Sequence, residues 1–197
     1  SSAEVYALFG QINYAITDKL HLTLGGRFSE EEIFTDISGF GGGVSQELTV
    51  RDTFDDFSPM IAVRYDLNED ASLYGTVAKG FKSGGVQVAP TPETETYKPE
   101  ELWNYEVGYK AELLNNSLRL NAALFYMDWT DLQTAFQESG VDEDGEFFIF
   151  GGIDNAEKAE SYGAELSITS APTDRLLLNL NIGWLQAEYK RFTALID

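Results

Sequence analysis

The stretch Tyr97–Gln133 reads YKPEELWNYEVGYKAELLNNSLRLNAALFYMDWTDLQ, and apolar and polar side chains alternate along it. One set of alternate positions holds Trp103, Tyr105, Val107, Tyr109, Ala111 and Leu113, and the set between them holds Asn104, Glu106, Gly108, Lys110 and Glu112. The pattern resumes after the sequence Leu-Asn-Asn-Ser at 114–117. Period two is typical of a β-strand, because successive side chains leave a pleated backbone on opposite faces. Asparagine tolerates the positive φ of tight turns, so the stretch predicts a β-hairpin.

The length of the apolar set indicates which solvent it meets. From Trp103 to Leu113 the strand is roughly 33 Å long. Tilted by ~40°, it covers roughly 25 Å of height, the apolar band of an outer-membrane barrel. The other face would carry Glu106, Lys110 and Arg119, which suit a wet lumen. A soluble β-sandwich can show the same alternation, so this hairpin by itself leaves both folds open.

Similar runs recur along the whole chain. Alternation or β-rich composition predicts strands at about 4–16, 20–28, 57–65, 72–85, 103–113, 118–126, 162–168 and 176–184. Pro59 lacks a backbone donor and predicts a bulge or weak pairing in the third of these strands. Segment 88–99 contains three prolines and predicts a loop.

Short and long connections alternate between these strands. Short turns are expected near Asp18, Glu69, Asn115 and Pro172. The long segments 29–56, 83–101 and 130–160 hold 21 of the 33 acidic residues but only three of the 13 basic ones. All short turns at one end and all long loops at the other is the outer-membrane pattern, whereas sandwiches mix connection lengths. The sequence therefore predicts an all-β fold, an antiparallel up-and-down transmembrane β-barrel.

Composition limits the function classes further. The formal net charge is −20, which leaves no basic footprint for a nucleic-acid partner. Cysteine is absent, so neither a disulfide framework nor a thiolate site is expected. The chain opens in a predicted strand and without a signal peptide. Because a barrel protein must be exported, we expect a mature protein or an excised piece.

Three strings resemble one family. SLYGTVAKGFKSGG at 72–85, the stretch TYKPEELWNYEVGYK at 96–110 and DNAEKAESYGAEL at 154–166 are similar to the C-terminal half of the barrel of TonB-dependent outer-membrane receptors. In that family a strand of the type lY…kGFksGG precedes a loop, PE…yEvG.K opens the next hairpin, and a GaEl strand follows. The resemblance covers about 72–166, and the flanking hairpins match by architecture only.

The resemblance implies fold, function and partners. Such receptors have about 22 strands, so the eight strands would be part of a larger barrel. Residues 1–197 would form a partial outer-membrane barrel domain, without the plug domain and the closing C-terminal strands. Function would be energy-coupled import of a scarce ligand, most commonly a ferric siderophore, across the bacterial outer membrane. Implied partners are outer-membrane lipid, the protein's own plug, the energy-coupling TonB protein and the small-molecule ligand.

Candidate sites follow from position, each with an alternative reading. Aromatic contacts for an external ligand are predicted at Phe40, Phe147, Phe148 and Phe150, which would otherwise pack on neighbouring loops. Lumen-facing polar residues are predicted at Arg64, Glu106, Lys110, Glu112 and Arg119, which would face an anionic ligand or the plug, or pair with one another. Membrane-interface aromatics are predicted at Tyr14, Tyr65, Trp103, Tyr126 and Trp184.

No chemistry of an enzyme is expected. The acidic run 142–146 has the acid density of a calcium loop without its ligand spacing, and a solvated loop is the simpler reading. His21 is the only histidine and is expected on the lumen wall. No nucleophile elbow, phosphate loop or metalloprotease motif occurs, so no catalytic, cofactor or metal site is predicted. The alternative function is a complete eight-stranded outer-membrane barrel with a structural or surface-binding role.

Overall fold

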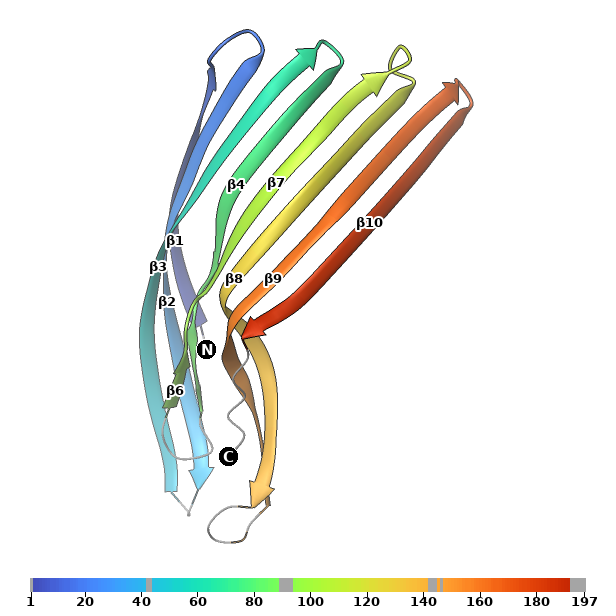
Figure 1. Ribbon diagram of the computed structural model, residues 1–197. Helices are drawn as coiled ribbons and strands as arrows, with labels where there is room; N and C mark the ends of the chain where they lie inside the picture. The colour runs from blue at the N-terminus through green and yellow to red at the C-terminus, as the bar shows by residue number, and fades with distance from the viewer. Residues whose placement is uncertain (1, 42–43, 89–93, 142–144, 146, 192–197) are drawn as a thin grey trace.

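The alternating stretch around Trp103 forms two neighbouring strands of a curved antiparallel sheet in a computed structural model of the chain (Figure 1). The structure describes residues 2–41, 44–88, 94–141, 145 and 147–191. Among these, the main sheet has eight strands in the order β1-β2-β3-β4-β7-β8-β9-β10. They are β1 (Ser2–Ala15), β2 (Leu20–Gly41), β3 (Val44–Asn68), β4 (Ala71–Lys82), β7 (Glu100–Leu113), β8 (Leu118–Val141), β9 (Phe147–Thr173) and β10 (Leu176–Arg191).

Each strand of this sheet pairs with its neighbour in sequence, apart from one inserted hairpin between β4 and β7. That hairpin consists of β5 (Gly85–Val88) and β6 (Thr94–Tyr97), which pair only with each other. The predicted up-and-down antiparallel all-β architecture is therefore confirmed. In the described part of the chain, no helix is long and apolar enough to cross a membrane.

Register sorts the side chains onto two faces. One ladder of directly paired residues joins Leu24, Ile61, Val77, Tyr105, Tyr126 and Tyr162, and the next joins Val63, Gly75, Val107, Leu124, Ala164 and Trp184. Large apolar side chains on this face are exposed, among them Val107 at 58% and Leu124 at 59%.

A hydrophobic core is missing from the described part of the chain, where the only buried apolar side chains are four alanines. A β-sandwich would bury its apolar faces between two sheets. This sheet instead offers a broad apolar face to its surroundings, which in water would be a large liability. The apolar face therefore requires a nonpolar solvent, and the soluble sandwich is excluded.

The four short turns lie together at one end of the sheet, at the top of Figure 1. At the central turn, Leu114, Asn115 and Asn116 all have positive φ, from 54° to 66°. Backbone hydrogen bonds tie adjacent hairpins together there: the Asp66 amide donates to the Lys19 carbonyl at 2.8 Å, and Ala171 to Ser117 at 2.7 Å. The short-turn end is thus a continuous hydrogen-bonded rim.

At the opposite end the structure corrects the expected connections. Segments 29–56 and 130–160 are mainly strand: β2 pairs with β3 as far as Gly41 and Val44, and β8 pairs with β9 as far as Val141 and Phe147. We call these two extensions the β2–β3 arm (residues 29–41 and 44–56) and the β8–β9 arm (130–141 and 147–160). Neither arm sustains the alternation of apolar and polar residues, so their strands carry no period-two signal.

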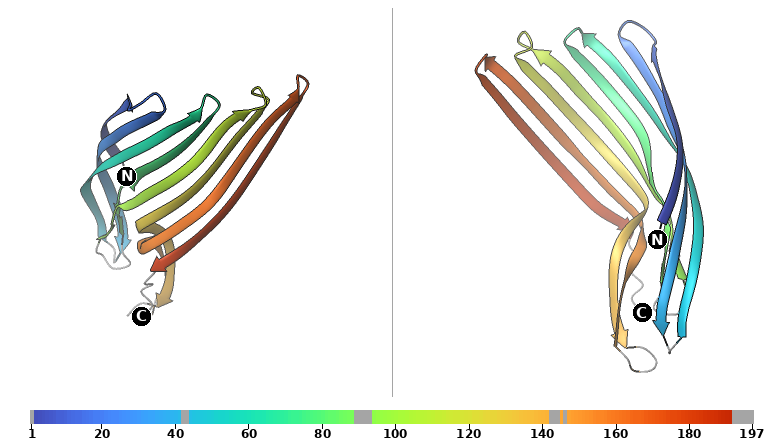
Figure 2. Two further views of the ribbon diagram at one scale, coloured as in Figure 1. Left: turned by 45° about the horizontal axis from the view of Figure 1, so that its top comes forward. Right: turned by 180° about the vertical axis from the view of Figure 1, so that it is seen from behind.

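One further expectation is wrong, and another is correct in one of its two alternatives. The segment predicted as a loop, 88–99, contains the strand β6, which pairs with β5. At Pro59, where a bulge or weak pairing is expected, the β2–β3 register passes through the Gly26–Pro59 pair without a shift, so there is no bulge. Pairing of β3 with β4 ends at Met60, one residue short of the proline, so the alternative of weak pairing is confirmed on the β4 side. Figure 2 shows that β3 and β4 diverge beyond this point.

Candidate functional site

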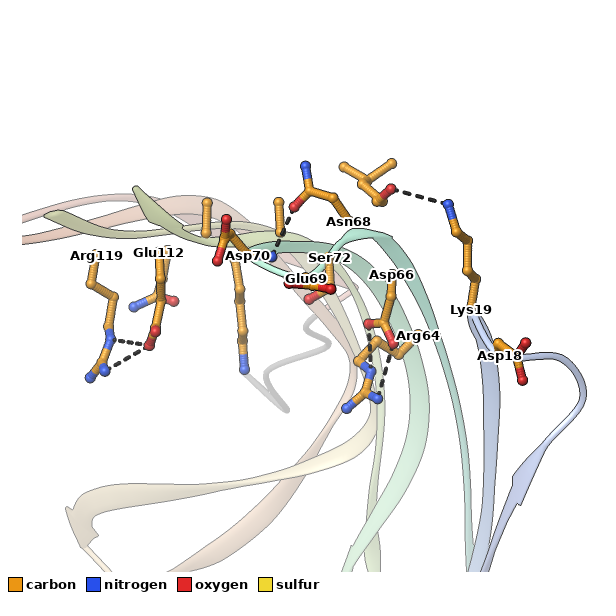
Figure 3. A pocket seen from close by; sticks show the side chains of 15 residues that line it. Asp18, Lys19, Arg64, Asp66, Asn68, Glu69, Asp70, Ser72, Glu112 and Arg119 are labelled. Carbon is orange, nitrogen blue, oxygen red and sulfur yellow. Dashed lines mark hydrogen bonds and ion pairs between the residues drawn. The ribbon is translucent and has the colours of Figure 1, made fainter. Parts of the chain in front are cut away.

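The five predicted lumen residues lie on one face of the sheet, opposite the apolar one. Arg64 pairs with Tyr74, which pairs with Gly108, between Glu106 and Lys110 on β7, and Glu112 pairs with Arg119. Figure 3 shows Arg64, Glu112 and Arg119 on the concave side of the curved sheet, beside a groove of about 830 Å³ at the short-turn end.

Ion pairs link some of these residues. The Arg119 guanidinium donates through Nε and Nη2 to Oε1 of Glu112, at 3.1 and 2.8 Å. Arg64 pairs with Asp66 across 3.0 Å, and not with Glu106 or Glu112. These cations on the concave face are thus already matched by carboxylates on the same or the adjacent strand.

Tyr74 completes a cluster that the sequence did not indicate. Its hydroxyl donates to Oε1 of Glu106 at 2.6 Å, and the Lys110 ammonium lies 4.9 Å from its ring centre. A Cβ at Gly108 would approach the Tyr74 ring to 2.4 Å. The E-x-G-x-K spacing of β7 therefore fits a tyrosine that reaches across from β4. Gly108 leaves room for the ring, Glu106 binds its hydroxyl and Lys110 lies over its face.

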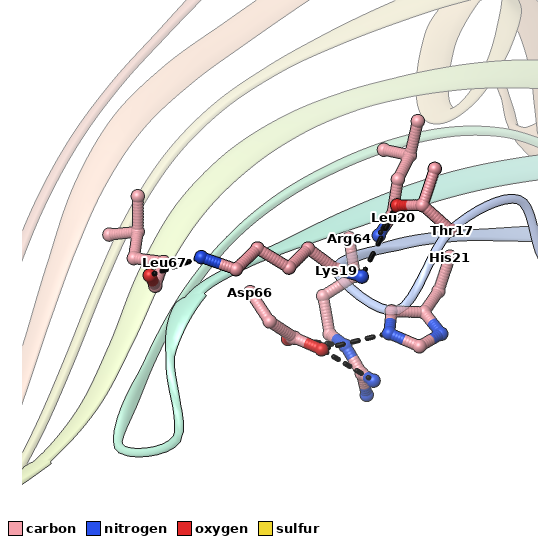
Figure 4. A network of polar contacts seen from close by, with 7 residues as sticks. All are labelled: Thr17, Lys19, Leu20, His21, Arg64, Asp66 and Leu67. Carbon is pink, nitrogen blue, oxygen red and sulfur yellow. Dashed lines mark hydrogen bonds and ion pairs between the residues drawn. The ribbon is translucent and has the colours of Figure 1, made fainter.

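His21 lies on the same face, near the short turn at Asp18. Its Nε2 is 2.8 Å from Oδ2 of Asp66, the carboxylate that also binds Arg64 (Figure 4). No group of three or more potential metal ligands occurs among the described residues. The geometry makes His21 part of a network of polar contacts on the sheet wall.

The predicted interface aromatics fall at two levels. Tyr14 and Tyr65 lie near the short turns and are exposed on the apolar face. Trp103, Tyr126 and Trp184 lie toward the arms, where they belong to a row with two aromatics that the sequence analysis missed, Tyr105 and Tyr162. Ring centres are 6.5 Å apart for Trp103–Tyr105, 6.1 Å for Tyr105–Tyr126 and 5.7 Å for Tyr162–Trp184.

The predicted ligand-contact aromatics lie at the ends of the two arms. Phe40 pairs with Ser45, next to the last pair of the β2–β3 arm. Phe147, Phe148 and Phe150 are at the start of β9. Phe147 is 68% exposed, and the side chains of the other three lie outside the described set. Residues 142–144 and 146 of the acidic run, the alternative calcium loop, also lie outside the described residues. The structure places these aromatics on two separate arms.

An ionic cluster with a buried carboxylate marks the fork where β3 and β4 diverge. Lys79 bridges Asp56 at 2.7 Å and Glu101 at 2.9 Å, and the Asp56 side chain is only 3% exposed. Ser58 donates a further hydrogen bond to Asp56. Farther along the arm, Arg51 pairs with Glu32, whose hydrogen bond and charge raise the pKa of Arg51. Apolar and polar residues do not alternate regularly along 72–85, so no periodic signal in the sequence indicates Lys79.

A coreless antiparallel sheet with an apolar outer face, aromatic rows and ionic residues on the concave side is the wall of an outer-membrane β-barrel. Residues 1–196 match the family model described as TonB dependent receptor-like, beta-barrel, and the chain belongs to that family. Its members are β-barrel proteins of the bacterial outer membrane, and the predicted family, fold class and location are confirmed.

Several proteins of this family resemble the chain. The pesticin receptor of Yersinia enterocolitica is 26% identical over 84% of the chain, and the ferric-pyoverdine BN7/BN8 receptor of Pseudomonas putida is 29% identical over 96%. The chain spans 23% of the length of each. In structure it resembles the ferric yersiniabactin uptake receptor FyuA from Yersinia pestis, with a TM-score of 0.78 at 24% identity, covering 95% of this chain and 27% of that one. These relatives are named as receptors and not as enzymes, and the alternative of a complete small barrel is not favoured.

Proposed function

We propose that this chain is a wall segment of a receptor that imports a ferric siderophore across the outer membrane by TonB-coupled transport. The observation that carries the proposal is the family match over 1–196 combined with relatives that are receptors for ferric pyoverdine and other metal chelates. The same proposal makes residues 1–197 a partial domain of a barrel of about 22 strands.

The two edges of the sheet support a larger barrel. In the described residues β1 and β10 each pair with one neighbour only. Unpaired backbone groups at an edge cannot be satisfied by lipid, so a spanning sheet must close on further strands. The concave face, with Arg64, Lys110 and Arg119, would then face the lumen and a plug domain inside it.

The arms would form part of the mouth of the barrel on the cell surface. The exposed Phe147 would offer an apolar contact to an entering chelate. So would Phe148 and Phe150, which are near it in sequence, and Phe40, which is on the other arm. Binding there is followed by passage through the lumen, for which TonB supplies the energy through the plug.

The test is uptake of radioactive iron by cells that depend on the full-length receptor. Cells are offered a panel of ⁵⁵Fe-loaded siderophores that includes ferric pyoverdine and ferric yersiniabactin. We expect uptake from at least one complex, with loss on deletion of the receptor and equal loss on deletion of TonB. The proposal would be contradicted if deletion of the receptor left the uptake of every complex in the panel unchanged.

A further inference from the structure

The β5–β6 hairpin lies in the space between the two arms, as Figures 1 and 2 show from several sides. Strand β5 contacts β2 and β3, and β6 contacts β9. The hairpin is thus the one described element that reaches from one arm to the other. Its place matters for any ligand that enters between them.

Side-chain amides hold the hairpin to the β8–β9 arm. Gln87 on β5 makes two hydrogen bonds with the backbone of Ile153: its Nε2 donates to the carbonyl at 2.8 Å, and its Oε1 accepts from the amide at 2.7 Å. This two-bond pattern is the one a paired strand residue would make. Gln87 therefore occupies the exposed edge of β9 beyond the last pair that β9 makes with β10, at Lys158.

Asn155 and Gln133, on the β8–β9 arm, bind the segments that flank the hairpin, at Lys98 and Ser83. Asn155 Oδ1 accepts from the Lys98 amide at 2.7 Å, while its Nδ2 donates to the carbonyls of Lys98 and Asp131 at 3.0 and 2.7 Å. Gln133 Nε2 donates to the carbonyls of Ser83 and Lys98, at 2.7 and 3.1 Å. Asn155 thus satisfies backbone groups of the segment that leaves the hairpin, whereas Gln133 satisfies one carbonyl of the entering segment and one of the leaving segment.

The entry into the hairpin has no room for larger residues. A Cβ at Gly84 would lie 2.3 Å from the Tyr97 carbonyl oxygen, and a Cβ at Gly85 would lie 2.3 Å from the Tyr97 hydroxyl. Both glycines are buried. A Cβ at Gly152 would likewise come within 2.8 Å of the Gln87 amide. Close packing and directed hydrogen bonds together define one position for the hairpin.

We propose that Gln87, Gln133 and Asn155 are positioning residues that hold the β5–β6 hairpin as a fixed inner wall of the receptor mouth. The ligand contacts the hairpin, and the amides act on affinity through it. Each hydrogen bond between an amide side chain and a backbone group stabilises the held position of the hairpin, and fewer polar groups are left unpaired. The ligand part of this inference rests on the proposed function, whereas the positioning of the hairpin does not.

The experiment uses the full-length receptor with a nitroxide label at Thr96→Cys on β6. This chain has no cysteine, and cysteines elsewhere in the receptor are replaced first. A second label at Thr130→Cys on β8 reports on the arm itself. Each label is combined with Asn155→Ala, Gln133→Ala or, as the matched control, Asn121→Ala on β8 near the short-turn end. Heat modifiability of every variant reports whether the barrel has folded.

Asn155→Ala removes the two hydrogen bonds that join this side chain to Lys98, which corresponds to about a 30-fold rise in the ratio of detached to held hairpin. We expect the Thr96 label to become mobile to a similar extent in Asn155→Ala and in Gln133→Ala, because each substitution removes two hydrogen bonds to the hairpin segments. The Thr130 label and Asn121→Ala should keep the spectra of the unsubstituted receptor. Affinity for the ferric complex taken up best, measured by tryptophan fluorescence quenching, should fall about threefold in Asn155→Ala, because fewer molecules are competent to bind.

Two results would overturn the inference. One is a Thr96 label that is as mobile in the unsubstituted receptor as in Asn155→Ala. The other is a label that becomes mobile while the affinity for the ferric complex stays unchanged. Failure of every ferric complex to bind the unsubstituted receptor would overturn the proposed function instead, and the label spectra would still decide whether the amides hold the hairpin.

Discussion

The membrane band of this sheet and its two arms are built from the same antiparallel pairing but obey different rules of composition. In the band, Leu124 and Val107 are exposed on one face while Glu106 and Lys110 share the other. In the β2–β3 arm, three consecutive glutamates at 30–32 place acid on both faces of one strand. The difference shows that the period-two pattern reports two different solvents on the two faces, and not the strand itself.

The largest expected effect concerns the edges of the band. Residues 1–197, refolded alone into detergent, should give no β-rich monomer that migrates differently when boiled and unboiled, because β1 and β10 would leave unpaired backbone groups in the apolar phase. The full-length receptor, refolded in parallel, is the control. A protease-resistant, heat-modifiable monomer of the short chain would mean that eight strands close by themselves.

A smaller effect separates the band from the arms directly. Leu124→Arg places a charge on the lipid face of the band and should destabilise the folded receptor by about 2–4 kcal/mol. Val141→Arg, at the tip of the β8–β9 arm and similarly exposed at 64%, should change stability by less than about 0.5 kcal/mol. Urea unfolding of both variants in lipid vesicles measures the difference. Equal losses would show that the arm is also covered by lipid or by protein.

The smallest effect tests packing on the concave face. Gly108→Ala would drive a methyl group into the Tyr74 ring, at 2.4 Å, and should cost about 1–3 kcal/mol. Gly75→Ala is the matched control on the apolar face, where a Cβ would meet its nearest atoms at an ordinary 3.8 Å. It should be neutral or slightly stabilising. Thermal unfolding of the two variants compares them, and a neutral Gly108→Ala would mean that Tyr74 moves freely.

The sequence predicted the band well because lipid imposes a strict alternation there. The run from Trp103 to Leu113, the Asn-Asn turn and the four short connections all follow from that rule. Alternation did not indicate the strands of the arms, where acids fall on both faces of one strand, as at 30–32, and the prolines at 90, 92 and 99 suggested an irregular loop in place of β6. Tyr105 and Tyr162 were missed as interface aromatics because only register shows that they join Trp103, Tyr126 and Trp184 in one row.

The site was less predictable than the fold for a related reason. Arg64 turns out to bind Asp66 on its own strand, and Lys79 bridges Asp56 and Glu101 across a fork. Which carboxylate a cation reaches depends on strand register and on where strands separate. Neither quantity is visible in composition or local spacing.

By itself, the sequence determined the class of this protein: alternation, turn chemistry and three family strings fix an antiparallel outer-membrane barrel wall, because hydrophobic patterning and turn residues act locally along the chain. Only the tertiary structure decided that the arms are strands, that Tyr74 covers Gly108, and that Gln87, Gln133 and Asn155 hold a hairpin between the arms. Gln87 and Ile153 are 66 residues apart. Their hydrogen bonds depend on the curvature of the whole sheet, which no local pattern encodes.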